Sequence, residues 1–332
     1  MRSMNGTGHN PPRMLERIFR PKIILLAVLA GAGLLACFAG QFGRYYTGLL
    51  TKVGINIILA VSLNLINGYT GQFSLGHAGF MGVGAYTAAA ITLFIGPNLL
   101  PVAGAAYYHW AAWGLFGAAL LAGGLAAAVA GVVVGLPSLR LKGDYLAIAT
   151  LGFGEIFRVI FCNIKSLGGG LGLNGIPRYT NLFWVYVTAA VCIYVVVAMV
   201  HSTYGRGFLA VRDDEVAAEA MGLNPTRYKM AAFVTGAFFA GIAGGLYGHD
   251  IRAIDPNGFG FMRSFDIVVM VILGGMGNTP GVIAAAIVLT LLPEWLRPVA
   301  EYRMVIYSLL LIVLMLTRPQ GLFTWRRKWK QV

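Results

Sequence analysis

Residues 112–135 read AWGLFGAALLAGGLAAAVAGVVVG, and this stretch decides the fold class. It contains no Asp, Glu, Lys or Arg, and its length falls within the range of about 17–25 apolar residues that a helix needs to cross a bilayer. Because a backbone in lipid must satisfy its own hydrogen bonds, such a segment is expected to be a transmembrane helix. Its many glycines and alanines are the small residues that let membrane helices pack closely.

Similar apolar runs recur along the whole chain. They are too long and too uniformly apolar to be strands of a membrane barrel. The sequence therefore predicts an all-α fold, a polytopic transmembrane helical bundle of about ten membrane segments that forms one domain over residues 1–332. The predicted segments are 23–40, 47–66, 77–96, 112–135, 145–163, 183–200, 231–249, 265–277, 281–293 and 304–317.

The composition excludes a soluble globular protein. Hydrophobic residues make up 58% of the chain and charged residues only 11%, whereas soluble domains carry about 25% charged residues. The net charge of +13 does not indicate a nucleic-acid partner, because the basic residues gather at the ends of apolar runs, as expected for membrane orientation. Cys37, Cys162 and Cys192 lie in apolar segments without the spacing of a metal site or a disulfide framework, and we predict neither a metal nor a cofactor.

The distribution of basic residues predicts the topology. If all ten segments cross and the N-terminus is cytoplasmic, 16 of the 25 Lys and Arg residues lie on the cytoplasmic side. The cytoplasmic parts then include an N-terminal segment (1–22), a loop (201–230) and a basic tail (318–332). The first apolar run also has features of a signal peptide, but the many spans that follow favour an uncleaved first helix.

Two glycine-rich stretches, 64–86 and 274–281, interrupt the apolar pattern. Irregular backbone at membrane depth is tolerated where protein or a water-filled cavity satisfies it, and paired interruptions are typical of transporter pathways. The alternative interpretation is a pair of tight interhelical turns with glycine packing. For His77, a hydrogen-bonded structural residue and a ligand are both open interpretations. We expect broken or re-entrant helices here, with pathway residues Asn67, Gln72, Ser74, Gly76, His77, Gly79, Tyr86, Gly275 and Asn278.

Two charges fall within the predicted span 145–163. Glu155 and Arg158 are three residues apart and therefore share one helix face. Charges in membrane segments usually face the bundle interior. One interpretation is a mutually neutralising structural pair, and the other places Glu155 in the substrate pathway.

The loop 201–230 contains a predicted short helix that begins near Asp213 and ends at Gly222, with Pro225 beyond. It is either an ordinary solvated helix or a docking helix for a cytosolic partner. The chain has no Gly-Lys dipeptide, hence no phosphate-binding loop, and no zinc-protease or nucleophile-elbow motif. We therefore predict a protein that is not an enzyme and has no ATPase motif of its own.

Four stretches together resemble one family, the LivH/LivM branched-chain amino acid permeases of ABC importers, which includes urea and amide permeases, and the resemblance is to its LivM type. These stretches are 67–86, 143–156, 205–225 and 273–281, so the resemblance covers most of the chain.

The resemblance implies a permease in the inner membrane of a bacterium, with both termini cytoplasmic. It implies four partners: a related LivH-like permease, two cytosolic ATPase subunits and an extracytoplasmic substrate-binding protein. It also implies coupling to the ATPases through Arg212, Asp213, Asp214, Glu215, Glu219 and Gly222. The substrate class stays open among branched-chain and other amino acids, urea and short amides. An ion-coupled secondary transporter and a passive channel are the rival function classes.

Overall fold

The described part of the chain is almost entirely helical. The computed structural model describes residues 43–99, 105–139, 141 and 143–297, with isolated positions at 302, 308, 309 and 312. The predicted all-α fold is confirmed within these residues, apart from one antiparallel pair of two-residue strands, β1 (Leu173–Asn174) and β2 (Ala253–Ile254). The α-helices are α2 (Arg44–Asn64), α3 (His77–Ala90), α4 (Gly96–Leu99), α5 (Ala105–Ser138), α6 (Asp144–Asn163), α7 (Leu182–His201), α8 (Thr203–Asp213), α9 (Glu215–Ala220), α10 (Pro225–Ile251), α11 (Phe261–Gly274) and α12 (Thr279–Trp295).

Two π-helical and three 3-10 segments complete the described elements. The π-helices η1 (Leu65–Tyr69) and η2 (Ile91–Ile95) extend α2 and α3, respectively. The 3-10 helices are η3 (Lys165–Leu167), η4 (Gly169–Leu171) and η5 (Pro256–Phe259).

Seven helical segments of the described residues are long and apolar enough to cross a bilayer, and α12 is shorter. The seven long segments and α12 together correspond to eight of the ten predicted segments. The predicted span 23–40 lies outside the described residues, and 304–317 is described only at isolated positions. The chain is thus a polytopic helical membrane protein, while the count of about ten spans stays a prediction.

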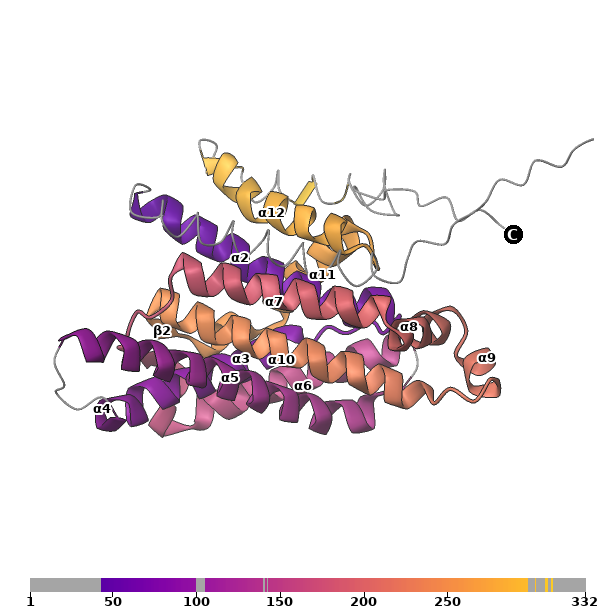
Figure 1. Ribbon diagram of the computed structural model, residues 1–332, viewed down its shortest axis with the longest axis horizontal. Helices are drawn as coiled ribbons and strands as arrows, with labels where there is room; N and C mark the ends of the chain where they lie inside the picture. The colour runs from indigo at the N-terminus through magenta and orange to yellow at the C-terminus, as the bar shows by residue number, and fades with distance from the viewer. Residues whose placement is uncertain are drawn as a thin grey trace, which may run out of the picture.

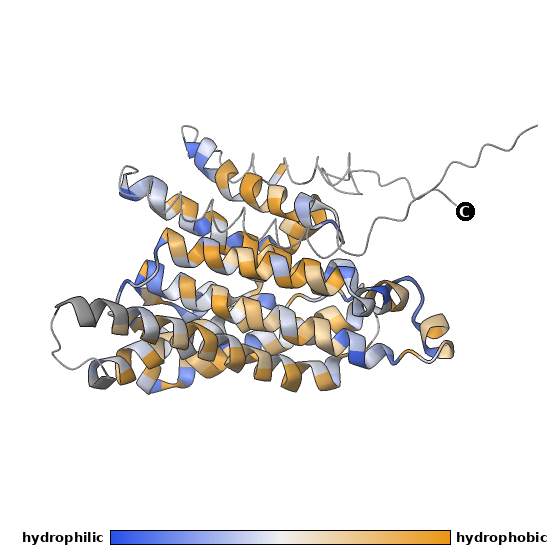
Figure 2. Cartoon of the chain, in the orientation of Figure 1, coloured by the Kyte–Doolittle hydropathy of each residue, from blue (hydrophilic) through white to orange (hydrophobic). Residues whose placement is uncertain are grey.

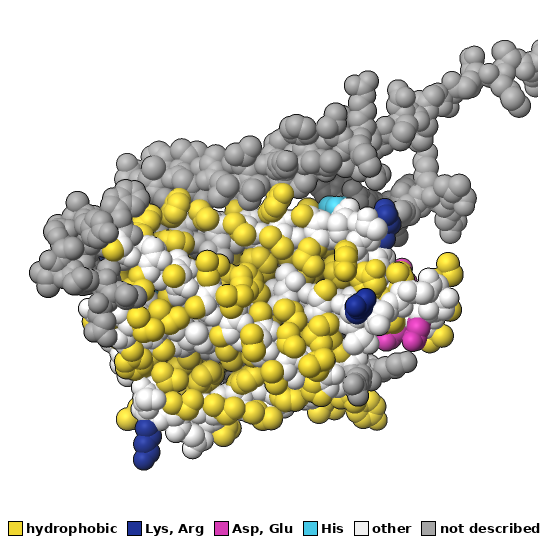
Figure 3. All heavy atoms as spheres, turned by 60° about the horizontal axis from the view of Figure 1, so that its bottom comes forward, with side chains coloured by type: hydrophobic (Ala, Val, Ile, Leu, Met, Phe, Trp, Pro, Cys, Tyr) yellow, Lys and Arg dark blue, Asp and Glu magenta, His cyan; other side chains and the backbone are white. Residues whose placement is uncertain are grey.

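The surface chemistry fits this assignment. Hydrophobic residues dominate the long helices, and hydrophilic residues concentrate around α8, where α8 leads into α9, and in the loops at the opposite end (Figure 2). On the face drawn in Figure 3, hydrophobic side chains form a broad band, with charged side chains toward its two ends. Lipid can contact such a band without desolvating charged groups.

Helices α3, α5 and α10 form the centre of the bundle, and α6 packs against α3 (Figure 1). Their close approach depends on glycine. A Cβ added to Gly84 of α3 would collide with the backbone of Gly241 in α10, and one added to Gly123 of α5 would lie 2.7 Å from the carbonyl oxygen of Gly84. Because no hydrophobic effect drives helices together in lipid, such backbone contact supplies much of the packing.

A second group of helices lies beside this trio. Helix α2 packs against α7, α10, α11 and α12, and α11 packs against α12. One end of the bundle carries α8 and α9, at the right of Figure 1. We call it the α9 end. Loops carrying the β1–β2 pair lie toward the opposite end.

The glycine-rich stretches differ from the predicted broken helices. Helix α2 continues through η1 to Tyr69, which makes one span of 26 residues, and residues 70–76 then connect it to α3. Residues 275–278 likewise connect α11 to α12. Each stretch therefore joins two helices, and neither interrupts a single helix. The predicted pair 265–277 and 281–293 becomes a hairpin of two packed helices, and its first helix begins earlier than predicted, at Phe261.

Candidate coupling and substrate-pathway site

The two glycine-rich connections meet each other at the α9 end. The backbone N–H of Gly277 donates to Oδ1 of Asn64, at 2.9 Å. A Cβ on Gly68 would collide with the backbone nitrogen of Gly277, so the two chain segments touch without side chains between them. The hydroxyls of Tyr69 and Thr279 are hydrogen bonded at 2.9 Å. Segments more than 200 residues apart in the sequence thus form one unit.

Arg212, near the end of α8, contacts both connections. Its Nη1 donates to the carbonyl oxygen of Gly68 at 3.3 Å, and its Nε and Nη2 donate to Oδ1 of Asp213 at 3.1 and 3.0 Å. A Cβ built on Gly277 would lie 3.2 Å from Nη1 of Arg212, and one on Gly71 would lie 2.8 Å from its Cγ. Gly71 and Gly277 have φ values of 69° and 80°, which favour glycine. We call Arg212, Gly68, Gly71 and Gly277 the arginine clasp.

A cluster of buried polar side chains lies beside the clasp. Within the described residues, five buried side-chain atoms have no hydrogen-bond partner, and all five belong to residues 64–77: Asn64 Nδ2, Asn67 Nδ2, Gln72 Oε1, Ser74 Oγ and His77 Nδ1. Most buried polar groups in proteins are satisfied by protein or ordered water. Their concentration in one short stretch agrees with the pathway interpretation, which stays a prediction.

His77 also has a structural partner. Its Nε2 is hydrogen bonded to Oγ of Ser62 at 2.9 Å, and its side chain is fully buried. Both interpretations of His77 therefore keep support, since Nδ1 is among the unsatisfied atoms.

Gly76 and Gly79 provide close packing between α3 and α6. A Cβ on Gly76 would collide with the carbonyl oxygen of Thr150, and one on Gly79 would lie 2.8 Å from Cα of Gly154. The amide of Ala78, in the first turn of α3, donates to Oγ of Ser264 at 3.0 Å. A donor that a substrate carboxylate could use at this helix start is therefore already bonded within the protein.

The predicted pathway residues Tyr86 and Glu155 form contacts away from the two glycine-rich connections. Tyr86 stacks on Phe161 at 4.3 Å between ring centroids, and its hydroxyl donates to the carbonyl oxygen of Ile254. Glu155 forms an ion pair with Arg158 at 2.6 Å, and Arg158 also donates to Asn257 at 3.0 Å. These contacts favour the structural interpretation of the Glu155–Arg158 pair. Gly275, with φ of 89°, and Asn278 lie in the second connection, beside the clasp.

The predicted coupling residues divide between structural and exposed positions. Asp214 caps α9 by accepting hydrogen bonds from the amides of Val216 and Ala217 at 2.9 and 3.0 Å. Glu215 pairs with the buried Lys229 of α10 at 2.7 Å. Gly222, with φ of 82°, ends the α9 segment. The predicted short helix is confirmed, whereas α8, which precedes it, was expected to be loop.

The exposed face of α9 is suited to a partner. Val216 and Met221 are 69% and 83% exposed, and Glu219 is exposed between them. Large apolar side chains at such exposure beyond the apolar band are a feature of interaction sites.

Replacing Asp214 with alanine is expected to destabilise α9 by about 1 kcal/mol, because two backbone amides lose their acceptor. Amide hydrogen exchange over residues 215–221 should accelerate about fivefold, with α10 unchanged. Asp213→Ala is the matched control, since Asp213 contacts Arg212 and caps no helix. Equal exchange in both variants would contradict the assigned cap.

Sequence reasoning missed a polar seam inside the bundle. Nη2 of Arg263 in α11 donates to Oδ1 of Asn56 in α2 at 2.9 Å, and Nδ2 of Asn56 donates to Oγ1 of Thr290 in α12 at 2.8 Å. Arg263 also lies over the ring of Tyr247, 5.8 Å from its centroid. The predicted segment 265–277 leaves Arg263 outside the helix, but Arg263 lies in the first turn of α11. The sequence signal for the seam was the polar side chain of Asn56 among the apolar residues of α2.

The comparisons with known proteins identify the family. The family model described as "Branched-chain amino acid transport system / permease component" matches residues 45–316. The chain belongs to this family. It is 32% identical to the high-affinity branched-chain amino acid transport system permease protein LivM of Escherichia coli, over 98% of this chain and 80% of the relative.

Other members of the family show the same relationship. LivM of Salmonella typhimurium is 33% identical over 93% of this chain and 76% of the relative. LivH of E. coli is 25% identical over 80% of this chain and 90% of the relative. No solved structure matches the chain. The predicted LivH/LivM membership is therefore confirmed, and the similarity to LivM is the stronger one.

Proposed function

We propose that the chain is the membrane-spanning permease subunit of an ABC importer and conducts branched-chain amino acids across the inner membrane of a bacterium. The family match over residues 45–316 carries this proposal. An extracytoplasmic binding protein delivers the substrate, a LivH-like permease completes the pore, and two separate cytosolic ATPases supply the energy. The α9 end faces the cytoplasm in the predicted topology, in which 16 of the 25 Lys and Arg residues, including those of both terminal segments, lie on the cytoplasmic side.

The geometry supports a specific route for coupling. The exposed face of α9 meets an ATPase subunit, and α9 is fixed to α10 by the Glu215–Lys229 pair. Movement of α8 and α9 reaches both glycine-rich connections through Arg212. The connections then separate or close at the cytoplasmic end of the pathway.

The polar seam supports passage of an amino acid. A zwitterion needs compensated charge in the membrane, because bare charges there are costly. Arg263 supplies a positive charge for the carboxylate, and Asp266, one helical turn further along α11, supplies a negative charge for the ammonium group. The unsatisfied polar atoms at residues 64–77 continue this route toward the α9 end.

Co-purification tests the proposal. The full chain, co-expressed with the neighbouring genes for a second permease and two ATPases, should purify as a complex whose ATP hydrolysis rises when substrate-loaded binding protein is added. Stimulation by a leucine-loaded binding protein supports the amino acid assignment. Stimulation by urea or a short amide alone would replace it with the alternative substrate class, and failure of any complex to form would overturn the importer assignment.

Replacing Arg263 with glutamine is expected to lower the uptake rate about tenfold or more. A hydrogen bond to a charged group contributes about 1.5–3 kcal/mol, and 1.4 kcal/mol corresponds to a factor of ten. Arg297→Gln is the control, because Arg297 lies just beyond α12 in an exposed pair with Glu294. Vesicle uptake of labelled leucine measures both. Normal uptake by the Arg263 variant would show that the polar seam is not part of the substrate pathway.

A further inference from the structure

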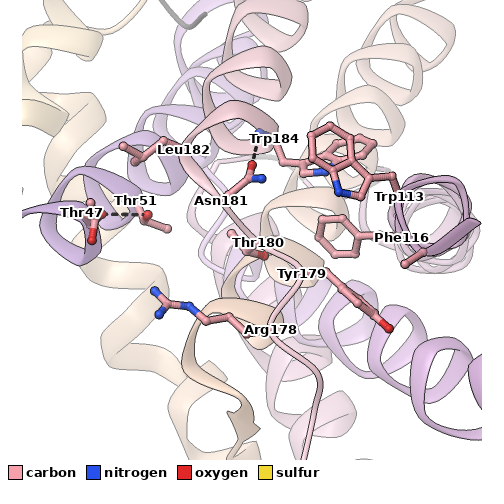
Figure 4. Close-up of a pocket in the computed structure, with 11 residues that line it drawn as sticks. Thr47, Thr51, Trp113, Phe116, Arg178, Tyr179, Thr180, Asn181, Leu182 and Trp184 are labelled. Atoms are coloured by element: carbon pink, nitrogen blue, oxygen red, sulfur yellow. Dashed lines mark hydrogen bonds between the residues drawn. The ribbon is translucent and has the colours of Figure 1, made fainter. Parts of the chain in front are cut away.

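The opposite end of the bundle from α9 holds a pocket that the transport route does not use. It has a volume of about 510 Å³ and lies between α2, α5 and the chain leading into α7 (Figure 4). Its walls include Thr47 and Thr51 of α2, Trp113 and Phe116 of α5, and Arg178 in the loop before α7. The pocket therefore combines hydroxyl groups, one cation and large aromatic rings.

The polar side of the pocket is cationic. Arg178 extends toward Thr47 and Thr51, whereas Trp113 and Phe116 lie on the other side (Figure 4). The side chain of Arg178 is 48% exposed, and its Nη2 pairs with Oδ1 of Asp250 at 3.3 Å. A guanidinium has five N–H donors, and this contact uses one of them, so Arg178 keeps donors for a further anion.

An apolar groove lies next to the pocket. The groove has a volume of about 790 Å³ and is lined by α5, α7 and α10. Trp184 lines both the pocket and the groove. On α5, Phe116 belongs to the pocket and the next residue, Gly117, to the groove. The cationic pocket and the apolar groove therefore adjoin at Trp184 and at the Phe116–Gly117 step.

The dimensions of the groove match one leaflet of a bilayer. On α5 it extends from Gly117 to Ala128, and on α7 from Trp184 to Val195. Each interval rises about 17 Å, against about 15 Å for half of a hydrocarbon core. Only 28% of the apolar stretch of α7 is buried within the chain, against 83% for α2, so α7 has a face available for lipid. Tryptophans such as Trp113 and Trp184 are common at the membrane interface.

We propose that this combined surface binds one phospholipid of the bilayer leaflet opposite the α9 end. The phosphate contacts the guanidinium of Arg178. The glycerol region contacts the threonine hydroxyls of α2 and the tryptophan rings. An acyl chain lies in the groove between α5 and α7. The lipid then joins α2, α5 and α7 at the end where no cytosolic partner binds.

Native mass spectrometry of the full chain, solubilised in mild detergent with defined phosphatidylglycerol and phosphatidylethanolamine, tests the proposal. One phospholipid should stay bound per chain. Arg178→Gln should weaken retention about fivefold, because a basic residue near a lipid surface contributes about 1 kcal/mol. Val191→Trp should weaken it more than about tenfold, because Val191, 42% exposed, lies in the groove and a larger ring would occupy the acyl position.

Two matched variants control for general damage. Arg297→Gln removes an arginine from a similar exposed pair, at 3.4 Å from Glu294. Val159→Trp adds the same ring to α6, where Val159 is 48% exposed outside the groove. Both should keep the lipid. Equal retention by all four variants would overturn the proposal. Loss caused by inorganic phosphate alone would also overturn it, because that result would show an anion site without a bound chain.

Discussion

Transport is expected to fall about tenfold or more when Arg212 is replaced with alanine, while the importer still assembles and hydrolyses ATP. Arg212 contacts both glycine-rich connections and lies in the last turn of α8, the helix that precedes α9. Removing its charged hydrogen bonds forfeits about 1.5–3 kcal/mol of coupling between the ATPase-facing helices and the pathway. Each 1.4 kcal/mol corresponds to a factor of ten. Uptake and ATP hydrolysis, measured on the same vesicles, separate this uncoupling from a loss of assembly.

Arg206→Ala is the matched control for this variant. Arg206 lies on the same helix α8 and is exposed to solvent. The control should transport normally, and Arg212→Lys should recover part of the activity because it keeps one charged donor. The clasp would lose its assigned role if the Arg206 and Arg212 variants lost transport equally, or if neither did.

Replacing Gly84 with alanine is expected to destabilise the bundle by about 1–3 kcal/mol or more. Its new Cβ would collide with the backbone of Gly241, so α3 and α10 would have to separate. Helix propensity alone would predict the opposite change in stability, because alanine in a helix is ordinarily more stable than glycine by about 0.5–1 kcal/mol. A lower apparent Tm of the purified chain, read by tryptophan fluorescence in detergent, is the measurement.

Gly114→Ala and Gly152→Ala are the controls, and neither is expected to destabilise the bundle. A Cβ at either position meets no atom within 4 Å, so these variants should be neutral or slightly stabilised. A central packing role for α3, α5 and α10 would be untenable if Gly84→Ala raised the Tm as much as the two controls.

The fold was predictable from sequence where lipid alone decides the structure. Apolar length located the long helices α2, α3, α5, α6, α7 and α10 and the hairpin of α11 and α12, because a backbone in a bilayer must form its own hydrogen bonds. Helix ends were less predictable. Helix α10 begins at Pro225 and not at 231, because its first residues pack against α8 at the α9 end and are too polar to register as a span.

The sequence indicated which stretches form the site, but not which of their residues contact each other. The glycine pattern of 64–86 and 274–281 indicated close backbone contact, but no local signal shows that Gly68 and Gly277 touch each other. Arg212 was assigned to a partner interface, whereas its guanidinium turns inward to the carbonyl oxygen of Gly68. The predicted segment 265–277 left Arg263 outside the helix, because the span rule does not count a charged residue at the start of a short helix. Such contacts are set by three-dimensional packing between helices far apart in the sequence.

Leucine accumulation in proteoliposomes tests the central claim most directly. Vesicles containing the chain, the second permease and both ATPases, with ATP at the α9 face and loaded binding protein at the other face, should concentrate leucine. Vesicles with the chain alone should not concentrate it under any imposed proton or sodium gradient. Accumulation by the chain alone would contradict the account, because it would place the energy source within this polypeptide.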